Sequence, residues 1–198
     1  MSPRPFVVVI SGGTASGKTT IAQALAARLG DRALLVSHDR YYRDVADPLD
    51  HNYDEPGALD TALLVEHLRA LRDHQPVTLP IYHFPIHRRL PEVDVVSPRP
   101  VILIEGLFVL GDPAVRSQAD LMVFVEAESD LRLARRLRRD VIERGWNIEQ
   151  VLTRYLRDVR EGYRRFIRPS RAYANVILDG EGPVEDSVTA LLSRLPAD

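Results

Sequence analysis

Apolar residues occur along this chain in short continuous runs, separated by longer segments in which they recur at helical spacing. The continuous runs, rich in Val, Ile and Leu, predict buried strands at residues 6–10, 33–37, 101–104, 121–125 and 175–178. The helical spacing predicts helices at residues 18–29, 59–72, 131–143, 148–166 and 184–195. Strands that alternate with helices are typical of a parallel sheet with helices on both faces. We therefore expect an α/β protein built on a five-stranded, mainly parallel sheet.

Residues 74–100 interrupt this alternation. They contain six prolines and no long periodic pattern, so we expect a loop with short strand pieces such as residues 77–79. No repeat or low-complexity segment divides the chain, and its length fits one domain with a small lid. We expect a single domain over residues 1–198.

The composition narrows the class of protein. Of 198 residues, 45% are hydrophobic and 27% are charged, which argues against a disordered, collagen-like or coiled-coil chain. Cysteine is absent, which rules out a disulfide framework and a cysteine nucleophile and suits a reducing compartment. No apolar run approaches the ~20 residues that span a bilayer, and a net charge of −2 rules out a globally basic nucleic-acid binder. We expect a cytoplasmic protein with neither nucleic acid nor a membrane as partner.

A glycine-rich turn joins the first predicted strand to the first predicted helix. Its residues fit the phosphate-binding pattern G-x-x-x-x-G-K-[ST]: Gly12, Gly13, Thr14, Ala15, Ser16, Gly17, Lys18 and Thr19. The glycines let successive backbone N–H groups point at phosphate oxygens, and the helix N-terminus adds its positive dipole. We expect Lys18 to reach the β- and γ-phosphates, Thr19 to hold Mg²⁺, and Thr20 to complete the nucleotide-binding loop.

The position of Lys18 strengthens this interpretation. It is the only lysine among 26 lysine and arginine residues. A bias toward arginine explains why lysine is scarce, but it does not explain why the remaining lysine lies in this loop. The planar fork of an arginine cannot replace a compact ammonium inside a tight loop, so Lys18 stands where a lysine is still required.

Two acidic residues follow predicted strands at the edge where a ligand would bind. Asp39 follows the second strand and Glu105 the third, and ligands of open parallel sheets bind at the carboxyl ends of the strands. Mg²⁺ needs oxygen ligands, and an attacking hydroxyl needs a proton acceptor. We expect Thr19, Asp39 and Glu105 to provide the metal ligands and Asp39 to be the general base. The structural alternatives are a helix cap for Asp39 and an arginine partner for Glu105.

Phosphoryl transfer also needs positive charge around the moving group. Residues 131–171 contain 13 of the 25 arginines, and we expect an arginine-rich helical lid over residues 131–168. One helix cannot turn all of its arginines toward one ligand, so some must be solvated surface. The candidates are Arg135, Arg136, Arg138, Arg139 and Arg144.

These motifs predict a phosphotransferase with a nucleotide donor, but they do not name the acceptor. A regulatory GTPase carries an N-K-x-D motif and an ABC-type ATPase a Ser-Gly-Gly-Gln signature, and the chain has neither. We expect the acceptor to bind at residues 40–58 and 77–97, which carry rings flat enough to stack against it. These rings are Tyr41, Tyr42, Tyr53, Tyr82, His83, Phe84 and His87.

Eight stretches together resemble the uridine kinase (uridine–cytidine kinase) family over nearly the whole chain. They are residues 11–19, 38–42, 52–56, 79–84, 105–107, 135–140, 143–145 and 169–174. The resemblance implies a three-layer P-loop kinase that uses ATP or GTP with Mg²⁺ to phosphorylate the 5′-hydroxyl of uridine and cytidine, in pyrimidine salvage. It also implies a homo-oligomer, commonly a tetramer, that is inhibited by CTP or UTP.

The resemblance implies roles for individual residues as well. Asp39 resembles the catalytic base, and Asp54, helped by Arg136, resembles the carboxylate that holds the ribose hydroxyls. Arg139 and Arg144 resemble the lid arginines near the phosphates. The nucleoside base would be read and enclosed by five side chains, with Tyr82 and His87 as the reading pair and Tyr42, Tyr53 and Phe84 as the walls.

The chain departs from the family pattern on the acceptor side. His83, Trp146 and Arg154 stand where the family usually has aspartate, arginine and glutamine. A different ring stacked on Trp146, or an anionic acceptor held by Arg154, is therefore a hypothesis. Two alternatives stay open at this point: a kinase of the same fold that acts on another alcohol or a phosphorylated sugar, and a nucleotide-binding regulatory protein without turnover.

Overall fold

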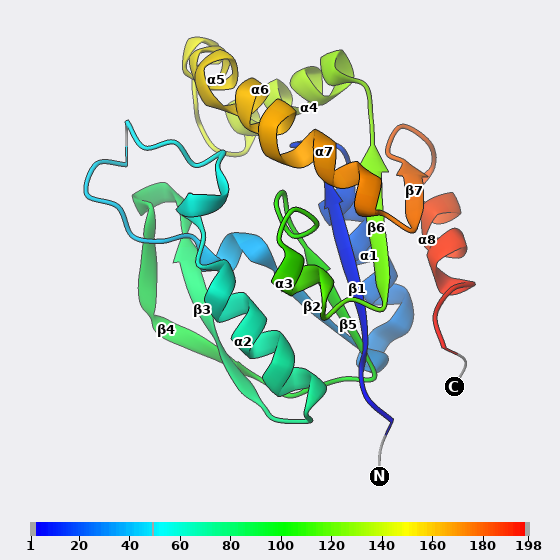
Figure 1. Ribbon diagram of the computed structural model, residues 1–198. Helices are drawn as coiled ribbons and strands as arrows, with labels where there is room; N and C mark the ends of the chain where they lie inside the picture. Colours follow the sequence, from blue (N-terminus) through cyan, green and yellow to red (C-terminus); the bar gives the residue numbers. More distant parts are fainter. Residues whose placement is uncertain (1–2, 49, 197–198) are drawn as a thin grey trace.

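Five parallel strands form the central sheet of the computed structural model, which describes residues 3–48 and 50–196. Their order across the sheet is β2-β5-β1-β6-β7 (Figure 1). The strands are β1 (Phe6–Gly12), β2 (Ala33–Ser37), β5 (Val101–Glu105), β6 (Leu121–Glu126) and β7 (Val176–Asp179). Neighbouring strands pair in parallel throughout. The predicted five-stranded parallel sheet is confirmed.

Alternate side chains of the central strand pack on opposite faces of the sheet, which produces three layers. Val8 and Ile10 belong to the core under α1 (Lys18–Leu29) and α8 (Val184–Leu192). Val7 and Val9 belong to the core under α2 (Thr61–Arg72) and α3 (Pro113–Arg116). All four side chains are fully buried, and each burial stabilises the fold by about 1.5–3 kcal/mol. A continuous apolar run in β1 is therefore what a sheet covered on both faces requires.

Residues 77–96 form a β-hairpin beside the main sheet. The strand piece predicted at residues 77–79 is confirmed as part of a longer strand, and the loop predicted around it is wrong. β3 (Val77–His83) and β4 (Arg88–Val96) pair antiparallel, joined by a 3₁₀ turn at Phe84–Ile86. Proline lacks a donor and is excluded from the middle of a sheet, but each strand of a two-stranded ladder keeps one free edge. Pro80 lies in β3 next to a shift in the pairing register. The proline content therefore marks edge strands here, not a loop.

The arginine-rich segment forms helices over the carboxyl ends of the strands (Figure 1). α4 (Ser129–Ile142) is followed by α5 (Ile148–Arg154), and the helical path continues through α6 (Arg160–Gly162) and α7 (Arg168–Ser170) to Tyr173. Two π-helical turns, Tyr155–Val159 and Tyr163–Ile167, separate these α-helical pieces. The predicted helix at residues 148–166 is thus confirmed and extends past its predicted end.

An ion pair closes the opposite edge of the sheet, where the strands begin. Arg72 at the end of α2 is 8% exposed, and its guanidinium lies 3.1 Å from Asp120 Oδ1. The second oxygen of Asp120 accepts a hydrogen bond from the Val7 N–H at 2.8 Å.

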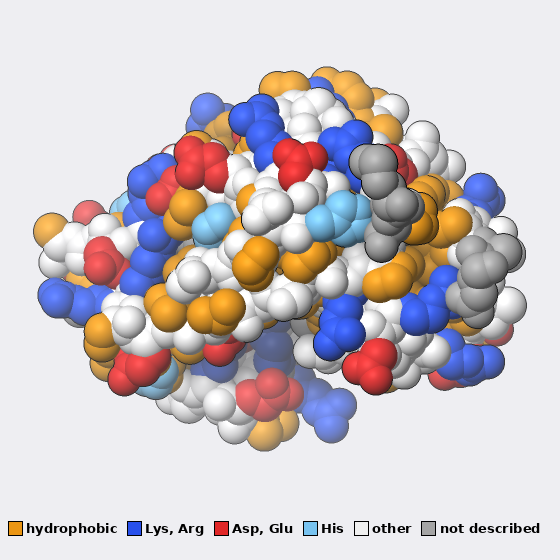
Figure 2. Space-filling view, turned by 90° about the horizontal axis from the view of Figure 1, so that it is seen from below, with side chains coloured by type: hydrophobic (Ala, Val, Ile, Leu, Met, Phe, Trp, Pro, Cys, Tyr) orange, Lys and Arg blue, Asp and Glu red, His pale blue; other side chains and the backbone are white. Residues whose placement is uncertain are grey.

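Figure 2 views this side of the molecule, on which cationic, anionic and hydrophobic side chains are interspersed. Within the described residues, no helix is both long and apolar enough to cross a membrane.

A buried histidine sits at the point where β2 turns toward the site. His38 begins the 3₁₀ turn His38–Tyr41 and is 1% exposed. Its Nε2 lies 3.1 Å from the Thr61 hydroxyl oxygen, and its Cβ packs against Gly106, where an added Cβ would come within 2.5 Å. Burial lowers the pKa of His38 to about 4. The folded protein therefore keeps this imidazole neutral, whereas the unfolded chain protonates it near pH 6.5.

We predict that His38 makes folding sensitive to acid. The unfolded state takes up the proton below about pH 6.5 and the folded state only near pH 4, so stability from the neutral imidazole is lost as the pH falls between these values. The free energy of unfolding of the wild type should drop by about 2 kcal/mol more than that of His38→Gln between pH 8 and pH 4.5. Urea titrations with EDTA at both pH values measure this difference, and a gap that does not change with pH contradicts the prediction.

Candidate active site

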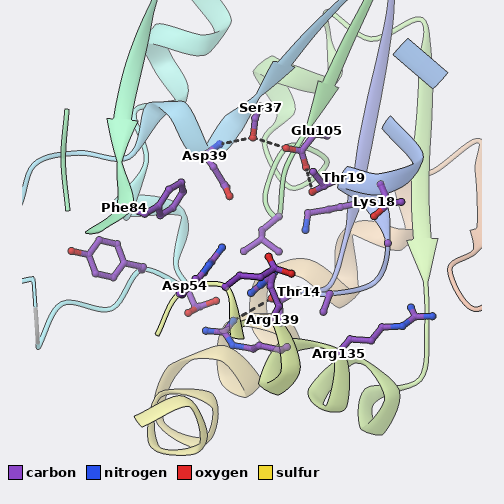
Figure 3. Close-up of a pocket in the computed structure, with 18 of the residues that line it drawn as sticks. Thr14, Lys18, Thr19, Ser37, Asp39, Asp54, Phe84, Glu105, Arg135 and Arg139 are labelled. Carbon is purple, nitrogen blue, oxygen red and sulfur yellow. Dashed lines mark hydrogen bonds between the residues drawn. The ribbon is translucent and has the colours of Figure 1, made fainter. Parts of the chain in front are cut away.

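A cleft of about 1170 Å³ opens at the carboxyl ends of the strands (Figure 3). Its lining comes from the phosphate loop, the ends of β2 and β5, the segment around residue 53, the β3–β4 hairpin and the arginine-rich helices. Segments that lie far apart in the sequence therefore meet at one edge of the sheet. This is the edge at which the motifs predict a ligand.

The phosphate loop connects β1 directly to α1. Gly17 precedes the first residue of α1 with φ of 99°, a conformation that favours glycine. Thr14, Ala15 and Gly17 to Thr20 line the cleft, whereas Gly12, Gly13 and Ser16 do not. Those three residues are buried and turn the chain behind the loop. The first turn of α1 thus presents its free backbone N–H groups toward the cleft.

Lys18 extends from this loop toward two carboxylates, as Figure 3 shows. Lys18 is half-buried in the wall of the cleft, and this burial lowers its pKa. Glu105 and Asp39 oppose the shift because their negative charges favour the ammonium form, while Arg139 and Arg136 add to it. The lysine is therefore held among charges of both signs, and the negative charge of a bound phosphate would raise its pKa again.

Glu105 joins three elements at the floor of the cleft. Its Oε2 accepts a hydrogen bond from the Thr19 hydroxyl at 3.0 Å, and its Oε1 accepts one from the Ser37 hydroxyl. Ser37 Oγ also accepts a hydrogen bond from the Asp39 N–H at 3.3 Å. Glu105 is 3% exposed. Ser37, which sequence reasoning did not single out, therefore links the two predicted acids.

Asp39 stands across the cleft from Lys18. Burial, together with the negative charge of the nearby Glu105, raises the pKa of Asp39 to about 6, although Lys18, Arg144 and Arg139 act in the opposite direction. A carboxylate with a pKa near 6 is more basic than a solvated one and is still largely ionised at neutral pH. The predicted general base has the electrostatic setting that proton acceptance requires.

The oxygen atoms of Thr19, Asp39 and Glu105 fit a hard cation such as Mg²⁺. Nowhere in residues 3–48 and 50–196 do three or more His, Cys, Asp or Glu side chains form a cluster that could hold a metal ion on its own. Mg²⁺ commonly uses one or two carboxylates and takes its other ligands from phosphates and water. The donor set therefore suits a cation that is held jointly by the protein and a nucleotide.

The five predicted arginines all line the cleft, but their side chains have different surroundings. Arg135 donates to the Gly180 carbonyl at 2.8 Å, and Arg138 is exposed. The other three surround one buried acidic side chain, Asp140, which sequence reasoning did not identify as part of the site: they are Arg136, Arg139 and Arg144.

Five of the seven predicted rings line the cleft beside Asp39 and form its aromatic pocket: Tyr42, Tyr53, Tyr82, Phe84 and His87. Tyr41 is fully buried in the core and, like His83, does not line the cleft. The Tyr53 and His87 rings stack at a centroid distance of 4.9 Å, and Tyr42 contacts Tyr82 at 5.3 Å. Phe84 meets the Tyr82 ring edge-on at 5.2 Å. Among the described residues, His87 Nδ1 is buried without a hydrogen-bond partner, and the Tyr53 and Tyr82 hydroxyls lie close enough for each to shift the pKa of the other. Flat walls that carry polar atoms suit a planar, polar ring.

Asp54 lies at the boundary between the aromatic pocket and the lid. Burial raises its pKa, and Arg136 opposes this shift. Gly162 packs directly beneath it: a Cβ on Gly162 would lie 2.1 Å from the Asp54 carbonyl oxygen. The sequence does carry a signal of this close approach, because Gly162 interrupts a helical pattern. Glycine in a helix interior lowers stability, so its presence there indicates a packing reason.

The three departures from the family pattern occupy different places. His83 is exposed at the end of β3 and is not part of the cleft lining. Arg154 and Trp146 line the cleft, with the guanidinium 4.7 Å from the centre of the indole ring. Arg154 also donates to the Pro48 carbonyl at 3.2 Å and lies 5.9 Å from the Tyr53 ring. It therefore connects the helical segment to the acceptor segment.

A family model and individual sequence relatives point to the same family. A family model described as phosphoribulokinase / uridine kinase family matches residues 7–186. The uridine kinase of Chloroflexus aurantiacus is 42% identical over 203 residues, which cover 100% of this chain and 97% of that protein. The uridine kinase of Alkaliphilus metalliredigens is 37% identical and covers 97% of this chain and 95% of its own length.

Solved structures agree on the fold. A putative fructose transport system kinase from Silicibacter sp. TM1040 superposes with a TM-score of 0.72 over 89% of this chain and 91% of its own, at 23% identity. Phosphoribulokinase from Rhodobacter spheroides gives a TM-score of 0.65 over 92% of this chain and 75% of its own, at 16% identity. At these identities the likeness concerns the three-layer architecture.

We predict that Gly162→Ala destabilises the protein although alanine is the better helix former. The added methyl group would collide with the Asp54 backbone, which should lower the free energy of unfolding by about 1–3 kcal/mol. Gly57→Ala is the matched control, because a Cβ there meets nothing within 4 Å. Urea unfolding of both variants measures the effect. Equal stability of the two variants would show that the close approach to Asp54 is not required.

Proposed function

Because this chain belongs to the phosphoribulokinase / uridine kinase family, we propose that it transfers the γ-phosphoryl group of a nucleoside triphosphate to the 5′-hydroxyl of uridine and cytidine. One observation carries the proposal: the phosphate loop and the aromatic pocket lie in the same cleft, on either side of Asp39. A phosphate donor and a planar acceptor bound there would meet at the carboxylate.

The phosphate loop supports a donor of the ATP or GTP type. The N–H groups at the start of α1 would bind the phosphate oxygens, and Lys18 would reach the β- and γ-phosphates. Thr19 and Glu105, with Asp39 at the edge, would hold Mg²⁺ together with the donor. When bound, the cation neutralises charge on the phosphates. The Glu105 carboxylate keeps the Thr19 hydroxyl in place for this role.

Asp39 is the proposed general base. In this role its carboxylate accepts the proton of the acceptor hydroxyl while that oxygen attacks the γ-phosphorus. Arg139 and Arg144 lie close enough to influence the pKa of Asp39, so their positive charge also lies near the transfer point. Phosphoryl transfer gains most from alignment and from such charge around the moving group.

The acceptor side supports a pyrimidine ribonucleoside. Tyr42, Tyr53 and Phe84 would form the walls around the base, and Tyr82 and His87 would offer it a hydroxyl group and a ring nitrogen. Asp54 has carboxylate oxygens free to hold the ribose hydroxyls, with Arg136 beside it. The comparisons do not favour another acceptor or a protein without turnover.

Two further properties remain predictions from the resemblance and the composition. A homo-oligomer, with the tetramer as the expected form, is compatible with the exposure of Val93 and Val95 on β4, at 50% and 74%. A cytoplasmic location follows only from the composition of the chain.

We predict that purified protein releases ADP from Mg-ATP when uridine or cytidine is added, and not with other acceptors. The aromatic pocket and Asp54 fit a planar base attached to a ribose. A coupled ADP assay with a panel of pyrimidine and purine nucleosides, sugar alcohols and phosphorylated sugars tests this. ADP release with a phosphorylated sugar alone would refute the proposed acceptor and leave the mechanism of transfer unchanged. No ADP release with any acceptor would overturn the proposal.

We also predict that Asp39→Asn lowers kcat by about 10²–10⁴-fold, because the amide cannot accept the proton. Binding of Mg-ATP should persist, since the phosphate loop and the other two proposed metal ligands, Thr19 and Glu105, are untouched. Single-turnover kinetics and calorimetric titration measure the two effects separately. A variant with the kcat of the wild type would exclude Asp39 as the base.

A further inference from the structure

Asp140 is a buried charge that the proposed chemistry does not use. It lies on α4, near the end of the helix, and is 1% exposed. A carboxylate this deeply buried is unfavourable unless cations and hydrogen bonds surround it. Its neighbours therefore indicate what it does.

Three guanidinium groups surround the Asp140 carboxylate. Arg139 Nε donates to Oδ1 at 2.8 Å, and Arg144 NH1 lies 3.4 Å from the same oxygen. Arg136 Nε lies 3.3 Å from Oδ2. The backbone takes part as well, because the Asp140 carbonyl accepts a hydrogen bond from the Trp146 N–H at 3.1 Å. Asp140 therefore fixes both the helix and the turn that follows it.

Each of these arginines faces a different part of the cleft. Arg136 donates to the Thr14 hydroxyl of the phosphate loop at 3.1 Å and also acts on Asp54. The positive charge of Arg139 lowers the pKa of both Lys18 and Asp39. The positive charge of Arg144 lowers the pKa of Asp39, and its guanidinium lies 5.5 Å from the centre of the Phe84 ring. One carboxylate thus anchors cations that reach the donor loop, the transfer point and the acceptor pocket.

We propose that Asp140 is a positioning residue, which sets the arrangement of Arg136, Arg139 and Arg144 in the transition state of phosphoryl transfer. This inference rests on the proposed kinase function. Without the carboxylate, three neighbouring guanidinium groups repel one another and lose their common anchor. Small displacements of groups that align a reaction are costly, because the rate depends on the geometry of the reacting atoms.

The first test compares Asp140→Asn with Asp130→Asn. Asp130 lies on the same helix, is exposed, and its side chain bonds only to the adjacent backbone in the described part of the chain. Asp140→Asn should lower kcat about ten- to hundredfold, and Asp130→Asn should leave it unchanged. Asp140→Glu, which keeps the charge, should recover part of the loss. Equal kcat values for the wild type and Asp140→Asn would overturn the proposal.

A double-mutant cycle separates positioning from a general effect on folding. Asp140→Asn is introduced into the wild type and into a protein that carries Arg139→Gln and Arg144→Gln. If Asp140 acts through these arginines, its replacement should change kcat by less than about threefold in the second background. The same fold-loss in both backgrounds would overturn the proposal. The cycle uses whichever acceptor supports turnover, so a different acceptor refutes the proposed substrate and leaves the Asp140 test intact.

Discussion

The Glu105 carboxylate is the interaction on which the site depends. It sits at the end of a central strand, where it is almost completely buried, and it accepts hydrogen bonds from a hydroxyl on α1 and a hydroxyl at the end of β2. A buried carboxylate must be satisfied in this way. The requirement ties the phosphate loop to the strand that carries Asp39. The distance between donor loop and base is therefore set by the core of the sheet.

The opposite side of the cleft is lined by arginines of the helical lid. Five arginines of α4 and the turn after it are held by groups of the protein itself: carbonyl oxygens hold Arg132 and Arg135, and Asp140 holds Arg136, Arg139 and Arg144. Each guanidinium has a fixed fork of donors, so a partner within the protein orients it before any ligand arrives. Preoriented charge needs little rearrangement during the reaction, and electrostatic stabilisation of transition states depends on this property.

Much of the fold follows from local patterns, and the exceptions have physical causes. Val7 to Ile10 could be assigned to a central strand because burial on both faces requires a continuous apolar run. The full length of the β3–β4 hairpin does not follow from the sequence pattern, because proline disfavours central strands, whereas a two-stranded ladder admits it. In the site, the motif residues gather in one cleft. Asp140 and Gly162 were not recognised, because their importance arises from contacts with distant segments: three arginines for one, the Asp54 backbone for the other.

The π-helical turns in the lid have a consequence for how this segment can change. Val151, Tyr155 and Val159 face the interior at intervals of four residues, and Asp158, Gly162 and Ile167 are buried as well. A regular α-helix repeats every 3.6 residues and would drift away from this spacing, whereas a turn with i→i+5 bonding takes up the difference. Loss of one residue from either turn would rotate everything beyond it by about 100° about the helix axis. The length of this segment is therefore as constrained as its composition, and tolerated insertions and deletions should be found in the surface loops instead.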